Sequence, residues 1–235
     1  MLQNTGYRDD YVYRSALVRR ILLGRHSLRT ATLIQEMRVE TSKADAVVLN
    51  GTSTAYEIKS DRDSLGRLGS QLDSYRKVFA SVCVVTSELH LDQVQNIAPE
   101  DVGIQLLTRR QHLHTVRRPT NAPERLTPTA ILESLRADEA AAILRNLGIE
   151  VPDVPNTRLR TTLQDLFSSL EPATLHREMV ATLRTTRSQA HLAEYVDSIP
   201  SSLKAIALTV ELKENARARF AEALHTPTES ALAWS

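Results

Sequence analysis

Apolar residues along the first half of the chain recur at two alternating periods. Residues 9–23 carry them at helical spacing and predict a helix, and residues 63–79 predict a second one. Residues 33–39 predict a strand, and the nearly continuous apolar runs 81–86 and 102–107 predict buried strands. This alternation indicates an α/β fold in which helices flank a sheet.

Two further runs rich in β-forming residues, 43–49 and 54–60, flank an Asn-Gly turn signal at residues 50–51. This arrangement predicts a β-hairpin. In the second run Glu57 and Lys59 alternate with apolar neighbours, so one strand face carries both charges.

The register of this hairpin decides which side chains share a face. A two-residue turn leaves Asp45 and Glu57 on opposite faces. A three-residue loop pairs Leu49 with Ser53 and sets Asp45 directly across from Glu57. Gly51 can supply the positive φ that such an odd-length loop needs.

Opposed carboxylates on neighbouring strands repel each other unless a positive charge lies between them. A divalent metal usually supplies this positive charge, and carboxylate oxygens favour Mg²⁺ or Mn²⁺. The chain has five lysines against twenty-four arginines, yet Lys43 and Lys59 both lie in this hairpin. The alternative interpretation is that Glu57 and Lys59 form an ordinary solvated charge pair on a half-exposed strand.

Each predicted helix also carries polar residues of interest. Asp9 and Asp10 fall in the first turn of the N-terminal helix, where acids commonly cap the helix and compensate its dipole. On the second helix Gln71 and Tyr75 are four residues apart and therefore share a face.

Taken in order, these elements and motifs resemble the PD-(D/E)xK nuclease superfamily over roughly residues 8–110. The Gln-x-x-x-Tyr spacing is similar to its RecB-like branch. Residues 42–79 are also similar to an uncharacterised bacterial and phage-associated family with this core. The resemblance implies a restriction-endonuclease-like mixed sheet flanked by helices.

It also implies a metal-dependent nuclease that hydrolyses phosphodiester bonds, with DNA favoured over RNA. Asp45 and Glu57 would bind Mg²⁺ or Mn²⁺ together with the main-chain carbonyl of Ile58. The metal would lower the pKa of a bound water and stabilise charge on the phosphorus oxygens. Lys59 would position or activate that water.

The remaining motif residues receive supporting roles from the same resemblance. Asp10, or less favourably Asp9, would fill an upstream acid position at which a glutamate is commoner. Gln71, Tyr75 and Lys43 would support the site or contact the nucleic-acid backbone.

The charge distribution agrees with a polyanionic partner without requiring one. The net charge is +1, but residues 1–125 carry 18 basic and 14 acidic side chains, whereas residues 126–235 carry 11 and 14. Three arginine pairs are candidate phosphate contacts or simply solvated side chains: Arg19-Arg20, Arg109-Arg110 and Arg117-Arg118.

Other residues give weaker signals. Cys83, the single cysteine, lies in an apolar strand and predicts a small buried side chain, which excludes a disulfide framework. His112 and His114 have ligand-like spacing on one strand face but no third ligand nearby, so we expect surface residues. With no signal peptide and no membrane-length apolar run, we expect a cytoplasmic protein without membrane contact.

Prolines at 119, 123 and 128 mark a change of pattern, after which strand signals stop. They predict a nuclease-like domain over residues 1–117, a linker over 118–128 and a helical domain over 129–235. The expected helical segments are 128–147 (broken near residue 137), 157–170, 171–186, 188–198 and 200–224. This domain would bind nucleic acid, a protein partner or a second copy of the chain.

Two alternatives to the nuclease remain. One is a non-cutting nucleic-acid-binding or regulatory protein that keeps a nuclease-like fold. The other is a phage or defence-system interaction protein that acts through its helical domain. Intact Asp45, Glu57 and Lys59 favour the enzyme over the non-cutting protein.

Overall fold

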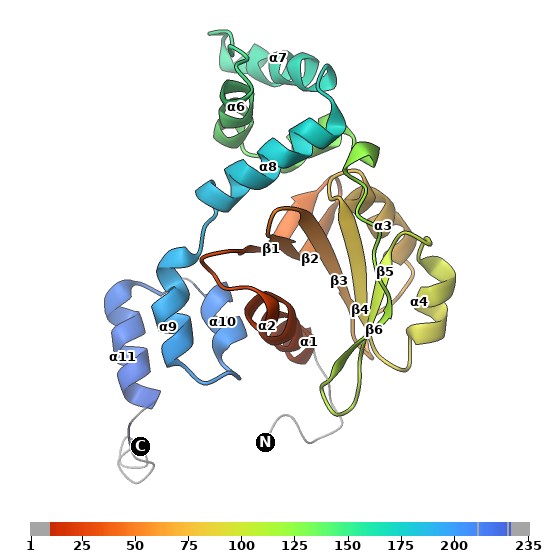
Figure 1. Cartoon of the computed structure of the whole chain (residues 1–235), viewed down its shortest axis with the longest axis vertical. Coiled ribbons are helices and arrows are strands. Elements are labelled where there is room, and N and C mark those ends of the chain that lie inside the picture. The colour runs from red at the N-terminus through yellow and green to blue at the C-terminus, as the bar shows by residue number, and fades with distance from the viewer. Residues whose placement is uncertain (1–9, 211, 225, 227–235) are drawn as a thin grey trace.

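The computed structural model describes residues 10–210, 212–224 and 226, apart from the side chains of Asp10, Arg25 and Asn156. A twisted sheet lies between two sets of helices, and a further group of helices extends from one end of the sheet (Figure 1). Two hydrophobic clusters, one on each face of the sheet, hold these layers together.

The sheet has six strands in the order of the sequence: β1 (Thr32–Val39), β2 (Ser42–Leu49), β3 (Ser53–Lys59), β4 (Ser81–Thr86), β5 (Gly103–Leu107) and β6 (Leu113–Arg117). The first three strands form an antiparallel meander, β3, β4 and β5 are parallel, and β6 returns antiparallel. Every residue of β4 is buried, because both faces of this central strand are covered.

The β2–β3 hairpin has the odd-length loop that places two acids on one face. Leu49 pairs with Ser53, and the next pairs run to Ala46 opposite Tyr56. Gly51 has a φ of 102°, the left-handed region that a glycine adopts without strain. The three-residue loop is therefore confirmed.

One face of the sheet is covered by a single long helix with a local irregularity. It runs through α1 (Asp10–Leu17), a π-helical turn η2 (Val18–Leu22) and α2 (Leu23–Arg25). Residues of α9 (Ala193–Ser198) and α10 (Lys204–Thr209) join the same apolar cluster, so segments distant in sequence share this core.

The opposite face is covered by α3 (Leu68–Arg76) and α4 (Leu91–Ile97). Their cluster continues into α5 (Pro128–Ser134), α6 (Ala137–Asn146), α7 (Asn156–Ser168) and α8 (Pro172–Thr186). The apolar core therefore runs without interruption from the sheet into these helices.

The expected fold is confirmed at the level of a mixed α/β sheet followed by a helical region. The helix expected over residues 63–79 is shorter, because Asp63 accepts hydrogen bonds from the amide and hydroxyl of Ser60 and lies in a loop. Helix α4 was not expected. The last helical segment is two helices, α10 and α11 (Glu214–Leu224), and residues 188–198 form η4 (Ala190–Leu192) followed by α9.

The proline-containing segment 118–128 is attached to the sheet. It contains the short 3-10 helix η3 (Pro123–Arg125), and the Ala122 amide donates to the Ala80 carbonyl at 2.9 Å. The Thr127 amide likewise donates to the Lys77 carbonyl at 2.8 Å. The division into domains at this segment stays a prediction. Within the described ranges, no helix combines the length and apolar character needed to cross a membrane.

Candidate functional site

A polar hollow of about 790 Å³ lies where β2 and β3 approach the N-terminal end of α3. Carboxylates, amines and hydroxyls line it together. Its lining residues are Thr41, Ser42, Lys43, Asp45, Glu57, Ile58, Lys59, Asp63, Arg67, Ser70 and Gln71. The hollow collects most of the residues that the sequence singled out.

The β2–β3 pairing ends with Ala46 opposite Tyr56, and Asp45 and Glu57 are the next residues of the two strands. The Asp45 Oδ2 accepts a hydrogen bond of 2.7 Å from the backbone amide of Ile58. The amide of Ile58, and not its carbonyl, therefore contacts this carboxylate.

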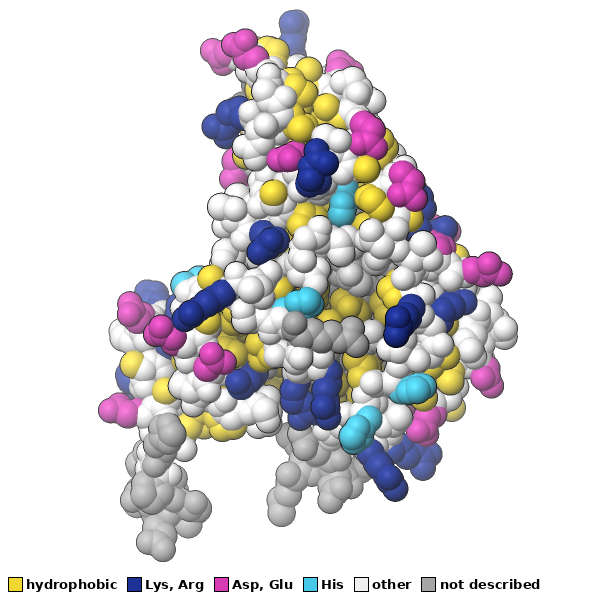
Figure 2. All heavy atoms as spheres, viewed as in Figure 1, with side chains coloured by type: hydrophobic (Ala, Val, Ile, Leu, Met, Phe, Trp, Pro, Cys, Tyr) yellow, Lys and Arg dark blue, Asp and Glu magenta, His cyan; other side chains and the backbone are white. Residues whose placement is uncertain are grey.

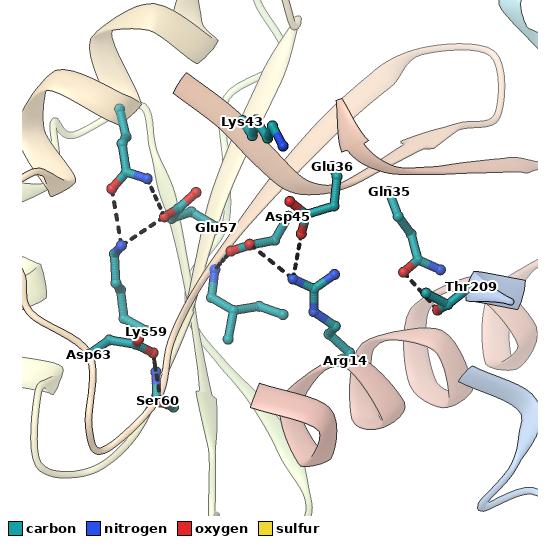
Figure 3. Close-up of polar contacts among 12 residues, drawn as sticks. Arg14, Gln35, Glu36, Lys43, Asp45, Glu57, Lys59, Ser60, Asp63 and Thr209 are labelled. Atoms are coloured by element: carbon teal, nitrogen blue, oxygen red, sulfur yellow. Dashed lines mark hydrogen bonds and ion pairs between the residues drawn. The ribbon is translucent and has the colours of Figure 1, made fainter. Parts of the chain in front are cut away.

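Glu57 is 3% exposed and both of its carboxylate oxygens are engaged (Figure 3). Its Oε1 accepts from Lys59 Nζ at 2.7 Å and from Gln71 Nε2 at 2.7 Å, and its Oε2 lies 2.8 Å from the Tyr75 hydroxyl. A buried carboxylate is tolerated when it is paired and hydrogen-bonded in this way.

The same contacts hold Lys59 and the helix residues in place. Lys59 Nζ also donates to Gln71 Oε1 at 3.0 Å, and the Tyr75 hydroxyl lies 2.6 Å from the Lys43 carbonyl oxygen. Burial, followed by the negative charge of Glu57, raises the pKa of Tyr75, so its hydroxyl stays protonated. The shared helix face of Gln71 and Tyr75 thus points at Glu57.

Arg14 and Glu36 belong to this neighbourhood, although the sequence did not single them out. From α1, Arg14 Nη2 lies 2.6 Å from Glu36 Oε1 and 3.4 Å from Asp45 Oδ1 (Figure 3). Glu36 lies opposite Asp45 in the β1–β2 register but has a φ of 51°, a strained value for a residue with a side chain. The one sequence feature that could have indicated Arg14 is its position one turn after Asp10 on the predicted helix.

The remaining predicted residues lie less centrally. Asp10 begins α1, and its side chain lies outside the described atoms, as does all of Asp9. Lys43 contributes its carbonyl to the Tyr75 contact, while its side chain is exposed at the edge of the hollow.

The residues as arranged do not fit the expected Mg²⁺ or Mn²⁺. Arg14 and Lys59 already supply the positive charge that the opposed carboxylates need, and protein donors occupy both oxygens of Glu57. Among the described residues, no group of three His, Cys, Asp or Glu side chains is placed to hold a metal ion. This arrangement therefore supports no reaction step that uses a metal.

The weaker candidates have mostly structural positions. Cys83 is fully buried in β4, and His112 and His114 are exposed, as expected. Arg117 is not solvated, because its guanidinium donates to three backbone carbonyls, those of Ala98, Pro99 and Val102. It holds β6 to the loop before β5.

Comparison with known proteins gives a family different from the one that the motifs indicated. Residues 3–207 match the family described as Bacteriophage P4 protein cII. Protein cII of Enterobacteria phage P4 is 39% identical over 79 residues, which cover 33% of this chain and 30% of that protein. The matched region thus spans less than a third of this relative. No solved structure matches the chain.

This finding overturns two expectations. The chain is not assigned to the RecB-like branch of the PD-(D/E)xK superfamily, because the matching family covers most of its length and is a phage protein family. The metal-dependent nuclease inferred from that resemblance is withdrawn with it, since neither match is a known nuclease. The chain belongs to the Bacteriophage P4 protein cII family.

Proposed function

We propose that this phage-associated protein is a regulatory protein that binds nucleic acid at the polar hollow without cutting it. The observation that carries the proposal is a pair of exposed cations, Lys43 and Arg67, on the edge of the hollow. Across the described residues, neither has a carboxylate within salt-bridge distance. Basic side chains and hydroxyls are the usual donors to backbone phosphates.

Two of the three acids of the hollow are paired with cations and repel a phosphate less than free carboxylates would. Asp45 contacts Arg14, Glu57 is paired with Lys59, and Asp63 accepts two hydrogen bonds from Ser60. Lys43 and Arg67 are therefore the cations available to a ligand, and Asp63 is the acid of the hollow that no cation contacts among the described residues. Hydroxyls of Thr41, Ser42 and Ser70 line the same space.

The same contacts favour binding over cleavage. Lys59 is 7% exposed, and its Nζ donates to Glu57 and Gln71, so these contacts compete with any contact to a water. Its contacts are those of a structural ion pair. Catalysis and Mg²⁺ or Mn²⁺ binding stay predictions, and the binding experiment below also tests them.

A restriction-endonuclease-like arrangement and a cytoplasmic location belong to the same proposal. The antiparallel meander β1–β3, followed by α3 and the parallel strand β4, supports that fold class. A fold of this kind hosts proteins that cut and proteins that do not. The cytoplasm is where nucleic acid is accessible to a phage-associated protein.

Electrostatic attraction over the whole surface contributes little to this binding. Figure 2 shows basic and acidic side chains interspersed on the viewed face, and the net charge is +1. Affinity should therefore depend on a few local contacts, and it should fall only moderately with added salt.

The test is fluorescence anisotropy with labelled single-stranded DNA, duplex DNA and RNA over a range of salt concentrations. The double variant Lys43→Gln/Arg67→Gln should bind more weakly, and its salt slope should fall by roughly 0.9 per lost phosphate contact for duplex DNA. The charge-matched control Arg160→Gln/Arg177→Gln, on the exposed surface of α7 and α8, should bind like the wild type.

Equal binding by both double variants would refute the hollow as the binding site. The same samples, incubated with Mg²⁺, Mn²⁺ or EDTA, should show intact nucleic acid on a gel. Shortened products with metal but not with EDTA would overturn the non-cutting proposal.

A protein partner is a second candidate, favoured by apolar exposure in the helical region. Val210 and Leu224 are 47% and 37% exposed, and they lie after α10 and at the end of α11. Light scattering during gel filtration tests self-association. A mass that doubles for the wild type but not for Val210→Ser/Leu224→Ser would support it.

A further inference from the structure

A second, mostly apolar hollow of about 220 Å³ lies on the other side of Asp45 from the polar hollow. Apolar side chains from α1, the sheet and α10 form most of its wall. The lining residues are Tyr11, Arg14, Leu17, Val18, Leu33, Gln35, Asp45, Ala46, Ile58, Ala205, Ile206 and Thr209. Asp45 and Ile58 line both hollows, so the two spaces are neighbours.

Polar groups meet at one end of this apolar hollow. The Thr209 hydroxyl donates to Gln35 Oε1 at 2.9 Å, which joins α10 to the edge strand β1 (Figure 3). The Thr209 hydroxyl also lies 2.9 Å from the Ala205 carbonyl oxygen, and the side-chain amide of Gln35 offers both donors and an acceptor at this end of the hollow. Arg14 and Asp45 add a guanidinium and a carboxylate to the wall.

We propose that the apolar hollow binds one unpaired base of a nucleic acid whose backbone phosphates lie at the polar hollow. This inference rests on the proposed function. An apolar wall buries the faces of a base, while amide, guanidinium and carboxylate groups match the donors and acceptors of its edge. Because Asp45 and Ile58 form a wall common to both hollows, a nucleotide whose base enters one has its phosphate next to the other.

The size of the hollow selects among ligands. Sites for drug-sized molecules commonly measure about 300–1,000 Å³, so a space of about 220 Å³ suits a single ring system and not a base pair. A base in a duplex is stacked and paired, and it must leave the helix to enter such a site. The protein should therefore prefer single-stranded or locally unpaired nucleic acid.

The test compares two labelled oligonucleotides of equal length with identical phosphates. One is oligothymidylate, and the other has abasic sugars throughout. Because burying and stacking one base contributes about 1–3 kcal/mol, the wild type should bind the base-containing strand roughly 5-fold to 150-fold more tightly. Equal binding of both strands would overturn the base site and leave the phosphate site standing.

A variant whose larger side chain fills the apolar hollow gives a second, independent measurement. Ile206 lines the hollow and is 43% exposed, so Ile206→Trp can project into the space without entering the core. The variant should bind oligothymidylate as weakly as the abasic strand. Leu89→Trp, at a position that is 69% exposed and absent from the lining, is the matched control and should keep the wild-type preference.

The two proposals fail in different ways. If the wild type binds neither strand at low salt, the proposed function itself is wrong. If it binds both strands, and Ile206→Trp and Leu89→Trp both keep a preference for bases, phosphate binding stands but the bases are recognised elsewhere.

Discussion

Two buried carboxylates, Glu57 in the sheet and Glu139 in the helical region, are held in similar ways but differ in their surroundings. Glu57 contacts Lys59, Gln71 and Tyr75. Glu139 is fully buried; it receives two guanidinium contacts of 2.7 Å from Arg187, together with bonds from Thr186 and the Arg136 amide.

Complete hydrogen bonding therefore does not identify a functional site in this molecule. Glu139 caps the start of α6 and joins it to the end of α8, which is a structural role. What distinguishes Glu57 is that Glu57 itself and a second acid, Asp45, line one hollow, whereas Glu139 does not line the hollow beside its partners Arg187 and Thr186. Loss of either cation should therefore destabilise the fold, to different extents, while loss of the Arg187 contact should leave nucleic-acid binding unchanged.

The largest expected effect comes from Lys59→Met. It leaves Glu57 buried without its cation, so we expect a loss of about 3–5 kcal/mol in the free energy of unfolding, measured by urea denaturation. The double variant Glu57→Gln/Lys59→Met removes both charges and should recover part of the loss. A loss below about 1 kcal/mol would show that water compensates Glu57.

Arg187→Met should have a smaller effect. Glu139 keeps the bonds from Thr186 and from the Arg136 amide after the guanidinium is removed. We therefore expect a loss of about 2–3 kcal/mol. Nucleic-acid affinity should not change at a temperature at which the variant is folded. A change in affinity would show that the ion pair of Glu139 and Arg187 also affects nucleic-acid binding and is not purely structural.

His176 on α8 links the helical region to the sheet, and its protonation should make the stability of the protein depend on pH. His176 is buried, its Nε2 lies 2.9 Å from the Ser53 hydroxyl of β3, and burial lowers its pKa. In the unfolded chain histidine titrates near pH 6.5. The stability that neutral His176 contributes is fully present above that pH and is lost as the pH falls towards the folded-state pKa.

Unfolding measured between about pH 7 and pH 5 should therefore show a decline that is weaker in His176→Gln. The matched control is His112→Gln, because His112 is exposed. Equal declines in all three proteins would show that other groups control stability in this window.

The strength of the sequence patterns explains which parts of the fold could be predicted. Alternation in residues 54–60 and the apolar run 81–86 determined β3 and β4, and the turn chemistry of Gly51 allowed the observed register. Helix α4 was missed because its seven residues give only about two turns of periodicity, although Leu91, Val94 and Ile97 stand at helical spacing. The split of the last helical segment into α10 and α11 carried no glycine or proline signal at residues 210–213.

The candidate site shows a different limit. Motif spacing brought Asp45, Glu57, Lys59, Gln71 and Tyr75 together correctly, because register and helix periodicity are local properties. The positive φ of Glu36 and the reach of Arg14 depend on packing between α1 and β1, which no local pattern encodes. The expected metal stays a prediction, and the pairing of Arg14 and Lys59 with the acids is a second way to balance their charge, which the motif spacing does not reveal.

The smallest expected effect is that of Mn²⁺ on the wild type. Arg14 and Lys59 already neutralise Asp45 and Glu57, so millimolar Mn²⁺ should leave the Tm nearly unchanged. In Lys59→Met a vacant cation position opens beside Glu57, and Mn²⁺ should restore stability by RT ln(1 + [L]/Kd), about 2.7 kcal/mol at a hundredfold excess over Kd. Adding Asp45→Asn to this variant should abolish the response, since one carboxylate binds Mn²⁺ weakly. A large rise in the wild type that Asp45→Asn removes would instead show that the metal displaces the lysine. Glu57 would then differ from Glu139 in binding a metal as well as in its position beside the hollow.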